Sequence, residues 1–144
     1  MQQLLKSIPY KEWFEVEGLT QREGNHNHIS KPILKAKFHV AGHILGSAYI
    51  EFDVNNKERV IFSGDLGAPY SPLLPAPKSP YRADVLVIES TYGDKCHESC
   101  FNRRQYLQKT IEASFLDGGT VLIPAFSIGR TQELLYEIEE ILLQ

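Results

Sequence analysis

The sequence has few cysteines and no long apolar run. Only two of its 144 residues are cysteine, Cys96 and Cys100, which is too few for the disulfide framework of a small secreted protein. No segment approaches the roughly 20 consecutive apolar residues of a membrane-spanning helix. The N-terminus, MQQLLKSIPYKEW, lacks the apolar core of a secretory signal peptide. We therefore predict a cytoplasmic protein without a membrane partner.

An excess of positive charge is also missing. Lysine and arginine together number 15 against 18 aspartates and glutamates, which gives a formal net charge of −3. This balance excludes a protein that coats nucleic acid through its whole surface. A local basic groove is still allowed, because residues 29–47 contain three lysines and no acidic residue.

Alternating apolar and polar residues predict strands in the first half of the chain. The segments 33–40 (ILKAKFHV) and 48–54 (AYIEFDV) have the period of two that is typical of a strand with one buried face. In the second segment we expect Ala48, Ile50, Phe52 and Val54 to face inward. Residues 59–64 (RVIFSG) form a third strand after the turn NNKE, and residues 11–17 could add a short one. This spacing predicts an antiparallel meander.

The second half of the chain has a different pattern. Residues 84–90 (DVLVIES) and 120–126 (TVLIPAF) are continuous apolar runs, as expected of fully buried strands. Residues 102–117 and the segment after Ser127, a plausible N-cap, have helical spacing. The order β-α-β-α predicts parallel pairing. The predicted class is therefore α/β, an antiparallel meander that leads into a β-α-β-α segment.

Three polar residues end apolar strands. His43, Asp65 and Glu89 each lie at or just past the end of a predicted strand, with glycines close by in the sequence. Glycine lets the backbone approach a ligand closely. An imidazole and a carboxylate suit zinc and similar ions, and a further carboxylate could orient a histidine or move a proton. If the strands are neighbours in one sheet, these residues form one site.

Each of these residues also has a simpler interpretation. His43 on its own could be a capped turn histidine, and Asp65 could be a turn aspartate, because S-G-D-L-G is good turn chemistry. Glu89 is harder to dismiss, since a carboxylate at the end of VLVI is costly to bury without a partner. From spacing alone the two interpretations stay balanced.

Other groups give weaker signals. His26 and His28 have H-x-H spacing but no further ligand nearby, and we favour a loop there. A structural zinc at Cys96, His97 and Cys100 would need a fourth ligand. Gly129 and Arg130 stand in the first turn of a predicted helix, where an anion could bind, although Arg130 could instead pair with a nearby acidic residue.

Four stretches in this order resemble those of a known family. They are AGHILGSAYIEF, IFSGDLG, VLVIESTYGDKCHE and VLIPAFSIGRTQELL. They are similar to the metallo-β-lactamase-fold nucleases with a β-CASP insertion, which include the cleavage-and-polyadenylation type of ribonuclease and its bacterial and archaeal relatives. The resemblance extends from about Phe38 to Leu135. It implies part of an αββα sandwich and a zinc-dependent hydrolase of RNA phosphodiester bonds, acting on single-stranded RNA.

The resemblance also implies roles for particular residues. His43 matches the lone metal-ligand histidine of the family's third motif, and Asp65 matches the aspartate that bridges two zinc ions. Asp65 and Glu89 are then the catalytic residues, with Glu89 hydrogen-bonding a later histidine that protonates the leaving group. The residues that fit as substrate-binding are His97, Gly129 and Arg130.

One motif of the family is missing from the sequence. The main metal motif, H-x-H-x-D-H, does not occur in it. We therefore expect a partial chain, with residues 1–93 as the C-terminal portion of the first metallo-β-lactamase segment and residues 94–144 as the beginning of the β-CASP insertion. Two alternatives stay open, a ligand-poor scaffold that pairs with an active relative and a metallo-hydrolase of small molecules. ESTYGD and GRTQELL argue against the second. A homodimer or a related subunit could complete the assembly.

Overall fold

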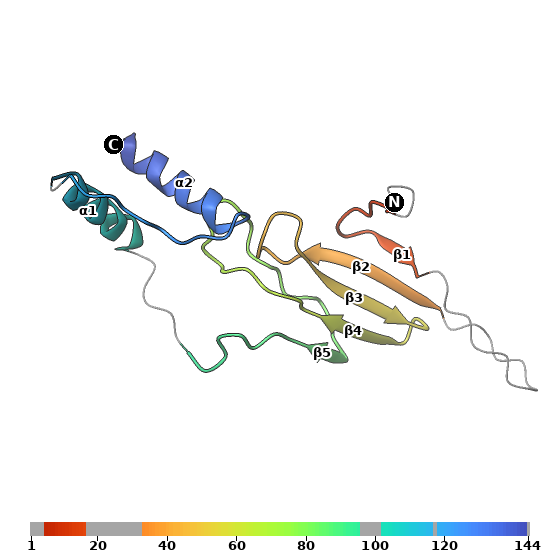
Figure 1. Cartoon of the computed structure of the whole chain (residues 1–144). Helices are drawn as coiled ribbons and strands as arrows, with labels where there is room; N and C mark the ends of the chain where they lie inside the picture. The colour runs from red at the N-terminus through yellow and green to blue at the C-terminus, as the bar shows by residue number, and fades with distance from the viewer. Residues whose placement is uncertain (1–4, 17–32, 96–101, 117, 144) are drawn as a thin grey trace, which may run out of the picture. The chain divides into compact units, whose positions relative to one another are not determined.

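A computed structural model describes residues 5–16, 33–95, 102–116 and 118–143. The chain divides into two compact units, Met1–Tyr70 with Leu74–Glu89 and Ser71–Leu73 with Ser90–Gln144. The described part of the first unit contains a five-stranded sheet, and that of the second contains two helices (Figure 1). Within the described residues, neither helix has the length and apolar content needed to cross a membrane.

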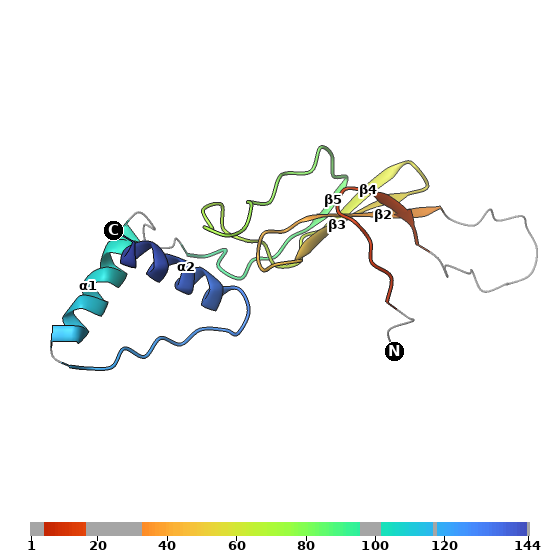
Figure 2. The same cartoon turned by 90° about the horizontal axis from the view of Figure 1, so that it is seen from above.

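The sheet is mixed, and its strands follow chain order. Its strands are β1 (Trp13–Glu15), β2 (Leu34–Val40), β3 (Ala48–Val54), β4 (Glu58–Phe62) and β5 (Val85–Val87). The first four pair antiparallel, and β5 is parallel to β4 (Figures 1 and 2). The β3–β4 turn passes through Asn55 and Asn56, whose φ angles of 55° and 54° suit asparagine in a tight hairpin. The predicted meander and the short strand before it are confirmed.

The pairing directions bring three strand ends together. Because β3 is antiparallel to both of its neighbours, β2 and β4 run in the same direction, and β5 runs with them. The C-terminal ends of β2, β4 and β5 therefore lie at one edge of the sheet. The loops that carry His43 and Asp65, and the segment that carries Glu89, all leave the sheet at this edge.

The buried face of β3 is the polar one. Tyr49, Glu51 and Asp53 are between 4% and 8% exposed, whereas the alternate positions are half-buried. The prediction that the apolar residues of β3 form the most buried face is therefore wrong for this structure. The reason is that long side chains cover the polar face. The indole of Trp13 lies 4.3 Å from Nζ of Lys37 and 4.6 Å from Cζ of Arg59.

Glu51 is the centre of this polar face. Its carboxylate lies 3.1 Å from Lys37 Nζ, 2.7 Å from His39 Nε2 and 2.7 Å from an Arg59 nitrogen. Burial alone would raise the pKa of Glu51, but hydrogen bonds from His39, Lys37 and Arg59 outweigh it, so that the pKa is below its usual value. The face is buried because its charges compensate each other.

The strand at residues 84–90 is shorter and more exposed than the sequence predicts. Only Val85–Val87 pair as β5, and all three side chains are exposed. β5 is the last strand in the sheet order, so it has a neighbour on one side only among the described strands. A continuous apolar run predicts burial on both faces, which the described residues do not provide for β5.

The second unit contains α1 (Arg103–Leu116) and α2 (Arg130–Leu142), close to the predicted helical segments. Glu137 of α2 is 7% exposed, and its two carboxylate oxygens bind Arg103 and Arg104 of α1 at 2.7 Å each. These ion pairs join the two helices. Burial alone would raise the pKa of Glu137, but the two arginines hold it below its usual value.

The predicted strand at 120–126 is absent from the described structure. This segment is extended without strand pairing, and Leu122 and Phe126 are exposed. A strand needs a partner, and the described part of the second unit contains no other strand. The β-α-β-α prediction is therefore wrong here, and the parallel pairing of the described residues is between β4 and β5. The cap of α2 is also different, because Gly129 takes the N-cap position instead of Ser127.

Candidate metal and hydrolytic site at the strand ends

A serine hydroxyl closes the loop that carries His43. After β2 ends at Val40, Ser47 Oγ accepts hydrogen bonds from the backbone N–H groups of His43 and Ile44, at 3.1 and 3.2 Å. The carbonyl of Ser47 accepts from the N–H of Ala41 at 3.1 Å. Gly46 has a φ of 87°, which a residue with a side chain rarely adopts. The loop therefore holds the backbone of His43 in place.

The loop that carries Asp65 touches the His43 loop through backbone atoms. The N–H of Gly67 donates to the carbonyl of Ala41 at 2.8 Å. A Cβ atom on Gly67 would lie 1.8 Å from the carbonyl oxygen of Gly42 and 2.7 Å from the backbone nitrogen of His43. A side chain at position 67 would therefore force the two loops apart.

The two loops place an imidazole beside a carboxylate. His43 Nε2 lies 3.8 Å from Asp65 Oδ2, and their side chains are 47% and 72% exposed. A long contact between two exposed groups contributes little to stability. Because both side chains are exposed, a ligand can reach the pair.

Glu89 is connected to the same loop by two hydrogen bonds. Its Oε1 accepts from the backbone N–H of Leu66 at 2.6 Å, and its own backbone N–H donates to Ser63 Oγ at 2.9 Å. Asp65 lies in the chain between these two anchoring residues. The structure thus brings His43 and Asp65 together and places Glu89 against the Asp65 loop.

The His43–Asp65 pair fits a zinc ion as two ligands of a larger set. Zinc binds histidine nitrogen and carboxylate oxygen at about 2.0–2.2 Å, so atoms 3.8 Å apart can contact one ion. Zinc takes four ligands in structural sites and three protein ligands in catalytic ones. Within the described ranges, no group of three or more His, Cys, Asp or Glu side chains could hold a metal. The described residues supply two donors.

The other predicted residues lie elsewhere or outside the described ranges. Gly129 and Arg130 begin α2 in the second unit, where an Arg130 nitrogen binds Glu133 Oε2 at 2.8 Å. This is the pairing with a nearby acid that the sequence left open, although the Arg130 side chain remains 70% exposed. The predicted residues outside the described ranges are His26, His28, Cys96, His97 and Cys100.

Sequence reasoning noted the glycines beside His43 and Asp65, Gly67 among them, but missed the serines that shape the loops. Ser47 and Ser63 carry no metal-ligand chemistry, so a search for ligands passes over them. Their positions next to His43 and Asp65 were the available signal. A small residue close to a ligand in the sequence is a candidate for holding the ligand's loop.

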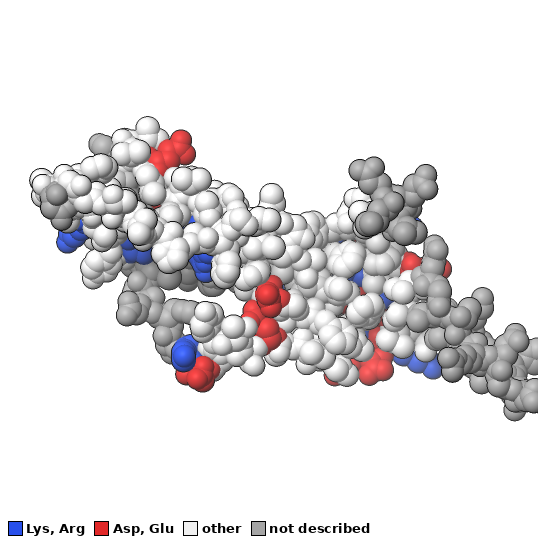
Figure 3. Space-filling model, viewed as in Figure 1, with Lys and Arg blue, Asp and Glu red and all other residues white. Residues whose placement is uncertain are grey.

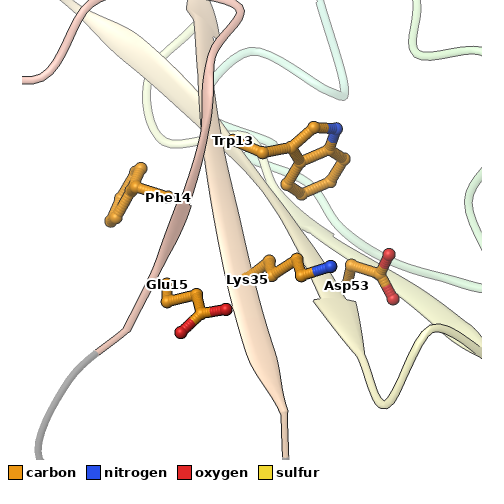
Figure 4. Close-up of a pocket in the computed structure, with 5 residues that line it drawn as sticks. All are labelled: Trp13, Phe14, Glu15, Lys35 and Asp53. Carbon is orange, nitrogen blue, oxygen red and sulfur yellow. The ribbon is translucent and has the colours of Figure 1, made fainter.

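A separate pocket of about 240 Å³ lies on the polar face of the sheet and does not include the strand-end residues. Figure 4 shows Trp13, Lys35 and Asp53 on one side of the strands, with Phe14 on the other side of β1. Asp53 Oδ1 is buried without a hydrogen-bond donor in the described structure, whereas Lys35 Nζ binds Asn56 Oδ1 at 3.3 Å.

In the view of Figure 3, charged side chains are scattered over mostly uncharged surface.

Comparison with known proteins identifies the class of this sequence. It is 38% identical over 104 residues to Endoribonuclease YSH1 of Saccharomyces cerevisiae, covering 72% of this chain and 13% of that protein. It is 32% identical over 132 residues to Ribonuclease TTHA0252 of Thermus thermophilus, covering 92% of this chain and 27% of the relative. It is 42% identical over 106 residues to an RNase J-like protein of Methanocaldococcus jannaschii, covering 71% of this chain and 25% of that protein.

These relatives are named as ribonucleases or as RNase J-like. No family model matches the sequence. The chain spans about a quarter or less of the length of these curated relatives. It is homologous to one segment of the β-CASP ribonucleases of the metallo-β-lactamase superfamily, and the resemblance seen in the motifs is confirmed. The mixed α/β structure is compatible with part of that fold.

Proposed function

We propose that this sequence belongs to a zinc-dependent hydrolase of RNA phosphodiester bonds. The observation that carries the proposal is the arrangement at the strand ends. His43 Nε2 lies 3.8 Å from Asp65 Oδ2, and the carboxylate of Glu89 accepts a hydrogen bond from the N–H of Leu66, the residue after Asp65. Supporting it, the homologues are named as ribonucleases and endoribonucleases.

The proposed roles are those that the resemblance to the β-CASP nucleases implies, and the chemistry of each side chain is compatible with them. His43 and Asp65 would hold zinc, with Asp65 shared between two ions and further ligands from outside the described residues. Bound zinc supplies an activated hydroxide and neutralises charge on the phosphate. Asp65 fits a shared role because its carboxylate has two oxygens and is exposed. Hydrolysis would break the P–O3′ bond and leave a 3′-hydroxyl and a 5′-phosphate.

Glu89 would act without binding the metal. Its Oε1 is already engaged by the N–H of Leu66, so its carboxylate is oriented by the Asp65 loop. In this position it would accept a hydrogen bond from a histidine outside the described residues and keep that histidine able to protonate the leaving oxygen. Glu89 would thus position the histidine and support its proton transfer to the leaving oxygen.

The rest of the assignment extends this proposal. The sheet would be one layer of an αββα sandwich, and the second unit would open a β-CASP insertion. His97, Gly129 and Arg130 would contact single-stranded RNA. The proposed compartment is the cytoplasm, and a homodimer or related subunit would complete the assembly.

The test is cleavage of a 5′-labelled single-stranded RNA by the full-length protein with added zinc. Asp65→Asn keeps the size of the side chain but removes a negative oxygen, so we expect cleavage to fall by about 100-fold or more, as for loss of a group essential to transition-state stabilisation. The matched control is Glu58→Gln, an isosteric change at an exposed residue of β4. It should leave the rate unchanged.

The outcomes separate the competing functions. Wild-type rates in Asp65→Asn would contradict the metal assignment. A protein that binds zinc or RNA but does not cleave would favour the non-catalytic scaffold. Cleavage of small esters without cleavage of RNA would favour the small-molecule hydrolase.

A further inference from the structure

Ser63 lies between two parts of the candidate site without belonging to its ligand chemistry. It directly follows β4, and it is 4% exposed. Its backbone N–H donates to the carbonyl of Val87 at 2.9 Å, which extends the β4–β5 pairing by one residue. The side chain of Ser63 is therefore fixed at the point where the Asp65 loop begins.

The hydroxyl of Ser63 makes two hydrogen bonds. It donates to the carbonyl of Gly64 at 2.7 Å and accepts from the backbone N–H of Glu89 at 2.9 Å. Gly64 has a φ of 53°, so the chain turns sharply at this point. The same oxygen thus holds the turn before Asp65 and the backbone of Glu89.

A second hydrogen bond connects the side chain of Glu89 to the Asp65 loop. The carboxylate of Glu89 returns to the Asp65 loop and accepts from the N–H of Leu66 at 2.6 Å. Ser63 and Leu66 therefore hold Glu89 at its backbone and at its side chain, and Asp65 lies between them in the sequence. Loss of the Ser63 contact would remove one of these two anchors of Glu89 and loosen the turn before Asp65.

We propose that Ser63 is a positioning residue, whose buried hydroxyl fixes the carboxylate of Glu89 relative to Asp65. This inference rests on the proposed hydrolytic function of the same site. Alanine at position 63 removes the hydroxyl oxygen that accepts from the Glu89 N–H. Threonine keeps the hydroxyl, and its branched side chain suits an extended segment.

The experiment compares Ser63→Ala, Ser63→Thr and Ile61→Val in the full-length protein. Ile61 of β4 is 2% exposed, and its side chain has no hydrogen-bonding group, so its truncation weakens packing without removing a hydrogen bond to Glu89. We measure kcat and KM on single-stranded RNA, zinc content, and amide hydrogen exchange in peptides spanning residues 63–66 and 87–89. Partners that orient reacting groups typically contribute about 10- to 100-fold in activity.

For Ser63→Ala we expect a loss of kcat in that range, with KM and zinc content unchanged and at least about tenfold faster exchange at the Glu89 amide. Ser63→Thr should restore both the wild-type kcat and the wild-type exchange rate of the Glu89 amide. The inference is overturned if Ser63→Ala keeps wild-type exchange, if threonine fails to restore it, or if Ile61→Val loses as much kcat. Absence of cleavage by the wild type would contradict the proposed function, while the exchange data would still decide the role of Ser63.

Discussion

At the scale of single residues, the small side chains decide the geometry of the candidate site. His43 and Asp65 carry the proposed metal-ligand atoms, and their separation depends on how closely two loops approach. That approach depends on Gly67, whose N–H binds the carbonyl of Ala41 and whose missing side chain leaves room for the carbonyl of Gly42. The ligand pair is a consequence of backbone packing.

Gly67→Ala tests this dependence. The new methyl group would lie 1.8 Å from the Gly42 carbonyl oxygen, so the two loops must separate. We expect destabilisation by about 1–3 kcal/mol, as for overpacking in a filled interior, and weaker zinc binding. Thermal unfolding and zinc titration of the full-length protein measure the two effects.

Gly93→Ala is the control for this substitution. Its Cβ would meet atoms of Ser90 at 3.3 Å, which is tight but within the range that a small shift relieves. Zinc affinity should stay at the wild-type value in this control. Unchanged zinc affinity in Gly67→Ala would show that the loop contact does not set the ligand geometry.

At the scale of secondary-structure elements, a charged cluster holds the polar face of the sheet. Glu51 of β3 binds Lys37 and His39 of β2 and Arg59 of β4, so one carboxylate connects three strands. The same cluster lowers the pKa of Glu51 against the opposing effect of burial. The strands are thus joined by side-chain charges in addition to their backbone pairing.

This cluster makes stability depend on pH. Because the pKa of Glu51 is lower in the folded state, its contribution is complete above the unfolded value of about 4.3 and is lost as the pH falls through the folded value. At pH 7 we expect Glu51→Gln to be less stable than the wild type by about 1–3 kcal/mol. The difference should shrink as the pH drops below about 4.3.

Thermal unfolding of the wild type and Glu51→Gln across this pH range measures the effect. Glu58→Gln, at an exposed position of β4, is the control and should follow the wild-type profile. A difference between wild type and Glu51→Gln that does not change with pH would contradict the account.

The strands could be predicted from the sequence where alternation and turn residues agree. β2, β3 and β4 follow period-two segments, and NNKE gave the turn between the last two. The buried face of β3 was predicted wrongly, because hydrophobic alternation does not reveal that Trp13 and Arg59 cover the polar side. The prediction of a strand at residues 120–126 was wrong for a related reason, since a strand depends on a partner that its own residues do not encode.

The proximity of His43, Asp65 and Glu89 could be predicted from the sequence, whereas the residues that support their loops could not. His43, Asp65 and Glu89 stood out because polar residues ended apolar strands. Their proximity then followed from strand direction. The contributions of Ser63 and Gly67 depend on contacts between segments more than 20 residues apart in the sequence, which local patterns do not show.

At the scale of the whole molecule, the chain corresponds to a segment of much longer relatives. The first of these, YSH1, is covered to 13% of its length, so the activity of the complete protein is a proposal from this segment. What the segment contributes is an edge of the sheet where three strand ends meet. We propose that this edge holds zinc through His43 and Asp65.

The most direct measurement is anomalous X-ray scattering at the zinc edge from crystals of the full-length protein. We expect a zinc peak at about 2.0–2.2 Å from both His43 Nε2 and an oxygen of Asp65. This peak should disappear in Asp65→Ala crystals that keep the same sheet. Zinc-replete crystals with no peak at this edge, or with a peak that does not contact His43 and Asp65, would show that these residues do not hold zinc.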